Sequence, residues 1–341
     1  HPILFRIPFP GWNLPWLGVV TSIPIYSYGV MLGLSLVVGW YLSLALADRD
    51  GLPKETMANC YVVTAVAAII GSRLLYVVTN IDDFHSVSDV FAFRSGGLVA
   101  YGGFIGGWVG SWAFLKAKRI PLLPWADVAV PSLATGLFIT RIGCYLFGCD
   151  FGARLTDSAP GFLKKMGTFP HWAEGTLEHG SGSPAWVHHV TLNLIDRDAT
   201  ASLPVHPTQL YESLVGLSLF GLLMLQRRSQ KFRGQVALLF FFSYGVLRFL
   251  LELVRDDAER GVYGPKVDGD IMIPGGLLLF AIGYVVAFSN TIRVKSIRLT
   301  TQVLAFVPAI VSFMLLRPAA FAAAEKVQYS TSQWVALISA L

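Results

Sequence analysis

Charged residues and cysteines are both scarce in this sequence. Of the 341 residues, 14% are Asp, Glu, Lys or Arg and 54% are hydrophobic, whereas a soluble domain carries about 25% charged residues. This composition excludes an ordinary water-soluble globule. The three cysteines, Cys60, Cys144 and Cys149, are too few for a disulfide scaffold and lack the spacing of a zinc site with four sulfur ligands.

The hydrophobic residues gather in long runs. Each run has about 18–23 residues, the length that an α-helix needs to cross about 30 Å of hydrocarbon. We therefore expect an all-α polytopic membrane protein with seven transmembrane helices, an eighth candidate at 302–323 and a small extracytoplasmic head. The seven expected spans are 27–47, 58–79, 97–115, 124–147, 208–226, 234–254 and 271–289.

Basic residues are concentrated in every second loop. Lys and Arg cluster after the first, third, fifth and seventh spans, at Arg49 and Lys54, at Lys116, Lys118 and Arg119, at Arg227, Arg228, Lys231 and Arg233, and at Arg293, Lys295 and Arg298. By the positive-inside rule these loops face the cytoplasm, so we expect the N-terminus outside. The expected segments are helices 1–4 in 1–149, the head in 150–207, helices 5–7 in 208–290 and a C-terminal extension in 291–341.

The head segment 150–207 is rich in turn-forming residues. Alternating apolar residues from Val187 to Leu194 predict a short strand. There is no HExxH motif or fixed ligand spacing, so we expect no metal site and interpret the histidines of the head as solvated loop side chains. These histidines are His171, His179, His188 and His189.

Four arginines fall within or at the end of apolar helices, namely Arg73, Arg141, Arg248 and Arg255. An ionised Arg at mid-bilayer costs from about 2.5–3.5 to more than about 10 kcal/mol, so each requires a partner or a wet cavity. The guanidinium is a planar fork of donors that stays charged, which suits it to a phosphate group. If the arginines converge on a ligand, we expect an anionic lipid at the outer leaflet.

Structural roles for the arginines remain open alternatives. Arg248 and Glu252 share one helix face with Tyr244 and Arg255, and they could form an ion pair that joins helices.

Arg141 has no acid within one turn, since the next acid along the chain is Asp150. It could pair instead with Glu212 or Asp127.

Six stretches form a further pattern along the chain. They are Ser27–Tyr28–Gly29, Gly71–Ser72–Arg73–Leu74, Gly96 to Gly103 with Gly106, Asp127 to Gly152 centred on Arg141–Ile142–Gly143–Cys144, His206–Pro207–Thr208–Gln209–Leu210–Tyr211–Glu212, and Tyr244 to Arg255. Taken together, they resemble the prolipoprotein diacylglyceryl transferases of bacteria. The resemblance runs from about residue 20 to 290, and the Arg-Ile-Gly block with His-Pro-x-Gln-Leu-Tyr-Glu is specific.

The resemblance implies a seven-span protein of the bacterial inner (cytoplasmic) membrane with its N-terminus outside. It also implies transfer of the diacylglyceryl group from phosphatidylglycerol to the lipobox cysteine thiol of a preprolipoprotein signal peptide, which makes a thioether and releases glycerol phosphate. The expected partners are therefore phosphatidylglycerol, these signal peptides and membrane lipid. No cofactor and no nucleic acid are expected.

Carried over by position, Arg141 and Arg248 correspond to the family's essential arginines and would bind the lipid phosphate, where they would offset the charge that builds on the departing oxygen. Tyr101 and His206 complete the expected catalytic set. Arg73 is expected to pack between helices or to lie behind the residues that contact the phosphate. Arg255 is expected at the outer water boundary. The residues expected to bind substrate are Tyr28, Arg73, Gly102, Gly103, Gly143, Gly148, Glu212, Tyr244, Glu252 and Arg255.

The chain departs from the family pattern at the residue that would take the thiol proton. Many members have His where this chain has Tyr101, and a phenol with a pKa of about 10 is a poor base at neutral pH. Deprotonation could rest on His206, on Glu252 or on lowering of the thiol pKa by the arginines.

A second departure replaces an Asn by Cys144 and shifts the acid to Asp150. Cys144 and Cys149 could form a disulfide or remain two thiols.

The glycines around Gly102 and Gly103 have small-xxx-small spacing, so they predict close helix packing or room for a lipid chain. Two rival functions are an anion transporter, for which the sequence shows no internal repeat, and a non-catalytic protein that handles lipids or lipoproteins.

Overall fold

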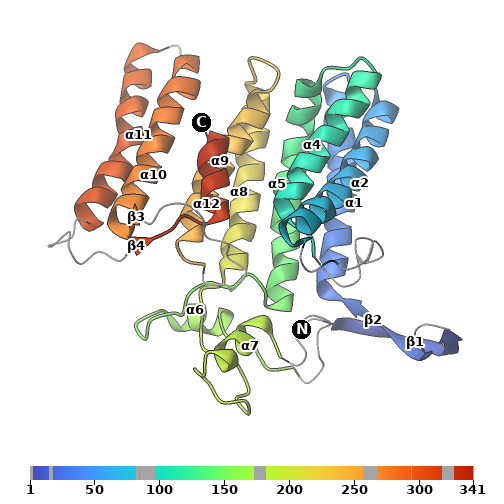
Figure 1. Ribbon diagram of the computed structural model, residues 1–341. Helices are drawn as coiled ribbons and strands as arrows, with labels where there is room; N and C mark the ends of the chain where they lie inside the picture. Colours follow the sequence, from blue (N-terminus) through green and yellow to red (C-terminus); the bar gives the residue numbers. More distant parts are fainter. Residues whose placement is uncertain are drawn as a thin grey trace. The chain divides into compact units, whose positions relative to one another are not determined.

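The computed structural model describes residues 3–14, 18–81, 84, 97–172, 182–255, 267–292, 294–316 and 326–340. They form two compact units. Unit 1 comprises His1–Asp150 and Leu155–Ala237, and unit 2 comprises Phe151–Arg154 and Leu238–Leu341. Both units are built from long helices, which confirms the expected all-α class (Figure 1).

Five long helices make up most of unit 1. They are α1 (Ser27–Arg49), α2 (Lys54–Thr79), α4 (Ala100–Ala117), α5 (Leu122–Phe147) and α8 (Thr208–Arg228). Helix α1 packs on α2 and α5, α2 packs on α4, and α5 packs on α8. Three of these helices begin directly after a proline, namely Pro53, Pro121 and Pro207, because a proline at a helix start sacrifices no intrahelical hydrogen bond.

Glycines allow α2 and α4 to approach until their backbones touch. A Cβ atom added at Gly102 would overlap the carbonyl oxygen of Gly71, and one added at Gly106 would overlap that of Ala67. Backbone atoms cannot move aside as a side chain can, so only glycine fits at these positions. The glycine pattern thus has the helix-packing role that its spacing predicted.

An antiparallel strand pair precedes the first long helix. Strand β1 (Ile3–Leu14) pairs with β2 (Gly18–Tyr26), with Ile3 opposite Tyr26. Strand β2 runs directly into α1, so the pair is fixed to the start of that helix (Figure 1). These strands were not expected from the sequence.

The head contains two short helices, α6 (Gly161–Met166) and α7 (Pro184–Thr191). The prediction of a strand from Val187 to Leu194 was wrong. The Ser183 hydroxyl accepts a hydrogen bond from the Trp186 amide, and Pro184 occupies the first helical position. These are helix-start signals, and they outweigh a short apolar alternation.

The interpretation of the head histidines as solvated loop side chains was wrong for His189, which lies on α7 and is buried. His189 is 2% exposed, and its Nδ1 accepts a hydrogen bond from the Leu203 amide at 3.2 Å. The His171 ring packs on Trp186 with ring centroids 4.4 Å apart. His179 lies outside the described residues.

Unit 2 contains the other helices of the described residues. Helix α9 (Gln235–Glu252) begins at the end of unit 1 and belongs to unit 2 from Leu238. It is followed by β3 (Val267–Asp268), α10 (Gly269–Gly283), η3 (Tyr284–Phe288), η4 (Ser289–Thr291), α11 (Lys295–Leu316), β4 (Lys326–Val327) and α12 (Thr331–Ala340). Phe249 of α9, Phe280 of α10, and Ala336 and Leu337 of α12 form its buried core.

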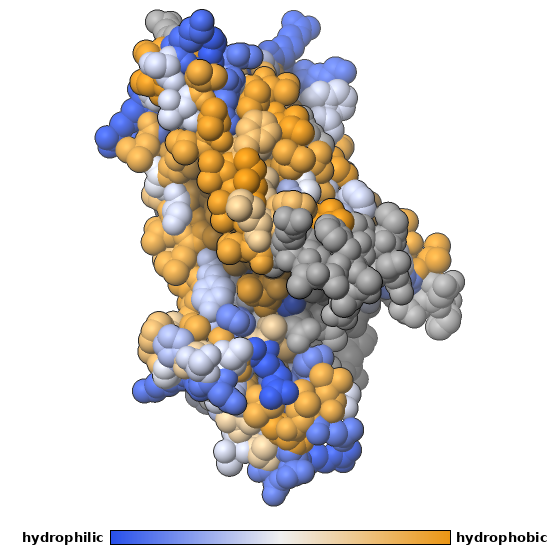
Figure 2. Space-filling model, turned by 90° about the vertical axis from the view of Figure 1, so that its left-hand side faces the viewer, coloured by the Kyte–Doolittle hydropathy of each residue, from blue (hydrophilic) through white to orange (hydrophobic). Residues whose placement is uncertain are grey.

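Among the described residues, seven helices are long and apolar enough to cross a membrane. The number agrees with the expected seven, although the set differs. Helix α11, which covers the eighth candidate, qualifies, whereas the glycine-rich α4 does not. Exposed apolar side chains such as Val303, Ile310 and Met314 cover α11, and Figure 2 shows apolar side chains spread over the helices of the face it presents.

Candidate active site

Arg141, on the last turns of α5, is held by two carboxylates of unit 1. Its Nη1 donates to Oδ2 of Asp150 at 2.7 Å, and its Nε forms an ion pair with Glu212 of α8. The side chains of Arg141 and Glu212 are 19% and 4% exposed. The pairing with Glu212 that the sequence left open is therefore present, and Asp150 is a second partner.

The backbone after α5 turns back towards the start of α8. Gly148 caps α5 in the left-handed conformation with φ +86°, and Asp150 has φ +55°. Thr208 then donates to the Asp150 carbonyl oxygen, and Gln209 donates to that of Cys149. Both donors are buried, so the first turn of α8 holds the Arg141 acid partner in place.

Asp127, the other partner considered for Arg141, has a different role at the opposite end of α5. Its carboxylate accepts hydrogen bonds from the amides of Gly234, Val236 and Ala237 at 2.6–3.0 Å. Asp127 is fully buried. It thus supports the first turn of α9, where amide groups would otherwise lack acceptors.

Two thiols lie beside Arg141. Its Nη1 is 3.9 Å from Cys144 Sγ, and Cys149 Sγ is 3.8 Å from Oδ2 of Asp150. Both cysteines are free, so the disulfide alternative is not formed. Contact with the Cys144 side chain, together with burial, holds the pKa of Cys149 well above its usual value of 9.0.

Cys144, Cys149 and Asp150 are a group that could hold a metal ion, since their donor atoms all lie within 4.8 Å of one another. The sequence did not predict this group, because its spacing matches neither a site with four sulfur ligands nor a histidine motif. The signal that could have found it is the Cys-x4-Cys-Asp spacing at a predicted helix end.

Helix α1 brings Tyr28 to the same end of α5. A Cβ added at Gly143 would lie 3.0 Å from Cβ of Met31 and 3.4 Å from Cα of Tyr28. The absence of a side chain at Gly143 therefore permits this crossing. The Tyr28 side chain is 41% exposed.

The two residues considered for proton transfer lie on different elements of unit 1. His206 precedes α8, and its Nδ1 is 3.2 Å from the Tyr211 hydroxyl. Burial lowers the pKa of His206 from its usual value of 6.5, so the imidazole is neutral at neutral pH. Tyr101 lies half-buried in the first turn of α4.

Arg73 of α2 is 4% exposed and packs among aromatic rings. Its guanidinium carbon is 5.5 Å from the Tyr76 ring centre and 5.4 Å from that of Phe84, and its Nη1 donates to the Gly97 carbonyl oxygen at 3.1 Å. Cation–π contacts of this kind stabilise a buried guanidinium.

Within unit 2, Arg248 and Glu252 form the intrahelical ion pair that the sequence left open. Arg248 Nη1 lies 2.8 Å from Glu252 Oε2, and its Nη2 donates to the hydroxyl of Ser332 on α12 at 2.9 Å. Tyr244 stacks on Phe240 one turn earlier. Arg255 forms a backbone bridge with Gly152 just beyond the end of α9.

Long apolar helices that carry arginine–carboxylate pairs with buried acids define a polytopic α-helical membrane protein with polar chemistry at its membrane-spanning segments. The family model for prolipoprotein diacylglyceryl transferase matches residues 15–316. The chain therefore belongs to this family of transferases.

Curated relatives agree with this assignment. A phosphatidylglycerol–prolipoprotein diacylglyceryl transferase 2 of Clostridium perfringens is 28% identical over 271 residues, which cover 78% of this chain and 94% of the relative. The corresponding transferases of Clostridium tetani and Bacillus cytotoxicus are 28% and 27% identical, over 73% and 79% of this chain and 88% and 89% of their own lengths.

Proposed function

We propose that this protein transfers the diacylglyceryl group of phosphatidylglycerol to the lipobox cysteine of preprolipoprotein signal peptides. The products are a thioether-linked lipid and glycerol phosphate. The observation that carries the proposal is the partly buried Arg141, held by Asp150 and Glu212 in a chain of this transferase family.

Arg141 and Arg248 are proposed to bind the phosphate of the lipid. When the thiolate attacks the glycerol carbon, negative charge grows on the departing phosphate oxygen, and a fixed guanidinium offsets it in a site of low dielectric. Removing one such donor typically lowers kcat about 10²–10³-fold. The carboxylates of Asp150 and Glu212 keep the Arg141 guanidinium oriented.

His206 is proposed to accept the thiol proton, with Glu252 or the arginine charges as the alternatives. Its lowered pKa keeps it unprotonated at neutral pH, which a base requires. Tyr101 would donate a hydrogen bond. The other residues proposed to bind substrate are Tyr28, Arg73, Gly102, Gly103, Gly143, Gly148, Tyr244 and Arg255.

The proposed location is a bacterial inner membrane with the N-terminus outside. The alternating basic loops support this orientation, which places the end of α5 on the outer side. Secreted signal peptides would then meet Arg141 at the level of the lipid phosphates.

The test uses the purified protein, phosphatidylglycerol and a lipobox peptide, and follows the thioether product and the released glycerol phosphate. We expect turnover that Arg141→Ala or Arg248→Ala abolishes and Tyr101→Phe only reduces. Full activity in Arg141→Ala would remove that residue from the mechanism. If the intact protein consumes neither lipid nor peptide, the transferase proposal is wrong.

A further inference from the structure

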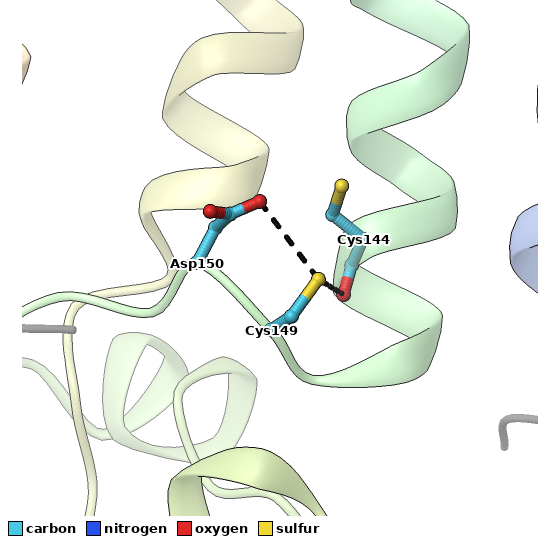
Figure 3. Close-up of side chains that lie close together, drawn as sticks. All are labelled: Cys144, Cys149 and Asp150. Carbon is cyan, nitrogen blue, oxygen red and sulfur yellow. Dashed lines mark hydrogen bonds between the residues drawn. The ribbon is translucent and has the colours of Figure 1, made fainter. Parts of the chain in front are cut away.

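The end of α5 gathers three donor atoms of the kind that bind soft metal ions. Cys144 lies on the last helical turns, Cys149 and Asp150 follow the turn at Gly148, and their sulfur and carboxylate atoms lie within 4.8 Å of one another. Figure 3 shows the Cys149 sulfur between the Asp150 carboxylate and the Cys144 carbonyl oxygen. We refer to Cys144, Cys149 and Asp150 as the thiol–carboxylate cluster.

The backbone of this cluster is fixed independently of any ion. The left-handed residues Gly148 and Asp150 direct Cys149 and Asp150 back towards α5. Buried Gln209 and Thr208 of α8 hold the carbonyl groups of the same two residues. Metal ligands that are held by a second layer of hydrogen bonds bind more tightly than mobile ones, so the geometry favours a binding site over a chance approach of side chains.

The charge of the surroundings permits a divalent cation here. Arg141 is positive and lies beside the cluster, but Glu212 and Asp150 both pair with it. A divalent ion that displaces the two thiol protons leaves the total charge unchanged. Two thiolates and one carboxylate form a ligand set that prefers Zn²⁺ to Mg²⁺ or Ca²⁺, which require oxygen ligands.

We propose that the thiol–carboxylate cluster binds one thiophilic divalent cation, Zn²⁺ or an ion of its kind, and that the lipobox thiol of the peptide occupies the remaining coordination position. Zinc sites with three protein ligands leave a fourth position for substrate. The inference rests on the proposed function. It assigns activation of the thiol to residues of this chain where Tyr101 replaces the usual histidine.

The chemistry follows from the ligand set. Binding to the ion deprotonates the thiol, since a thiol that coordinates zinc loses its proton, and His206, the proposed base, accepts that proton. The sulfur then forms a bond to the glycerol carbon, the bond from that carbon to the phosphate oxygen breaks, and the electron pair leaves with glycerol phosphate. Arg141, 3.9 Å from Cys144 Sγ, lies close enough to bind the leaving phosphate beside the attacking sulfur. The thioether product is a poor ligand and departs, while the ion stays.

Cobalt(II) tests the cation site without turnover, because thiolate complexes of cobalt absorb visible and near-ultraviolet light. We expect the full-length, reduced, chelator-treated protein to bind one Co²⁺ per chain with a sulfur-to-cobalt band that Zn²⁺ removes. Cys144→Ser and Cys149→Ser should each lose most of the band. Cys60→Ser is the matched control, since Cys60 is buried in the hydrophobic core of unit 1, and it should retain the band.

Three results would overturn the cation site. The first is that the unaltered protein shows no cobalt band, and the second is that the band survives in both cysteine variants. The third is a disulfide between Cys144 and Cys149 in mass spectra of the purified protein. Because each cysteine is tested separately, a folding failure of one variant leaves the other as a test.

Thiol binding is tested with the cobalt-loaded protein and a lipobox peptide in the absence of phosphatidylglycerol. The visible bands should shift with the cysteine peptide and stay unchanged with the same peptide carrying serine. An unchanged spectrum with the cysteine peptide would overturn the coordination of substrate.

The transfer assay separates this inference from the proposed function. Chelation should lower the rate about 100-fold or more, the size of effect that thiol deprotonation can supply. Metal-free protein that transfers at full rate would overturn the role of the cation and leave the transferase function intact. Cobalt-loaded protein that coordinates the peptide thiol but forms no thioether would contradict the transferase function and leave the cation site intact.

Discussion

Nη1 of Arg141 lies 2.7 Å from Oδ2 of Asp150. The same carboxylate oxygen is 3.8 Å from the sulfur of Cys149, so one acid contacts both the proposed phosphate-binding group and a proposed metal ligand. A change at any of these three residues should therefore be felt by the other two.

Arg141→Lys keeps the charge but removes the fork that contacts two carboxylates. A lysine ammonium cannot present two parallel donors to Asp150 and Glu212, so we expect the transfer rate to fall about 100-fold or more. Single-turnover measurements of thioether formation check this. Arg197→Lys, at an exposed arginine of the head, is the matched control and should retain the rate. An Arg141→Lys protein with unchanged turnover would show that paired donors are not required.

Asp127→Ala should destabilise the protein more than it disturbs the chemistry. The substitution leaves the amides of Gly234, Val236 and Ala237 without their acceptor, and each hydrogen bond to a charged group contributes about 1.5–3 kcal/mol. We expect thermal unfolding in detergent at a clearly lower temperature. Asp198→Ala, at an exposed acid, should leave the unfolding temperature in place. Equal unfolding temperatures for the two variants would contradict this role of Asp127.

If His206 is the base, the transfer rate should fall at acidic pH, where the imidazole becomes protonated. Burial lowers its pKa below the usual 6.5, so the neutral imidazole persists at neutral pH and is lost only as the pH falls through that lowered value. The rate of the unaltered protein should be level near pH 7 and decrease on acidification below 6.5. His206→Gln should lower the rate and remove this limb. If the variant keeps the same acidic limb, another group accepts the proton.

Gly106→Val should separate α2 from α4. The added Cβ would overlap the carbonyl oxygen of Ala67 and lie 2.9 Å from Cα of Gly71, and overpacking of this kind costs about 1–3 kcal/mol. Gly33→Val is the control, since nothing lies within 4 Å of a Cβ at Gly33. We expect only the first variant to unfold at a lower temperature. The same loss in both would point to helix propensity instead of packing.

The membrane-spanning helices could be predicted from the sequence because hydropathy acts on each helix separately. The span expected at 124–147 corresponds to α5 (Leu122–Phe147), and that expected at 208–226 corresponds to α8 (Thr208–Arg228). The strands β1 and β2 could not be predicted in this way. Strand β1 contains Pro8 and Pro10, and proline is ordinarily a signal against a strand.

The acid partners of Arg141 could not be predicted from the sequence. Asp127 precedes Arg141 by 14 residues on the same helix, which is about 21 Å along its axis, so helix geometry alone excludes it. Glu212 and Asp150 reach Arg141 through tertiary contacts: the turn at Gly148 and the packing of α5 on α8. Hydrophobic periodicity carries no information about such contacts.

The hydrogen bond from Arg248 to Ser332 has a practical consequence for expression. The family match ends at residue 316, so a protein trimmed to that boundary would lose the hydroxyl that accepts from Arg248, together with Ala336 and Leu337 of the core of unit 2. Poor activity of such a shortened protein would reflect the loss of these C-terminal contacts and would say nothing about the catalytic residues.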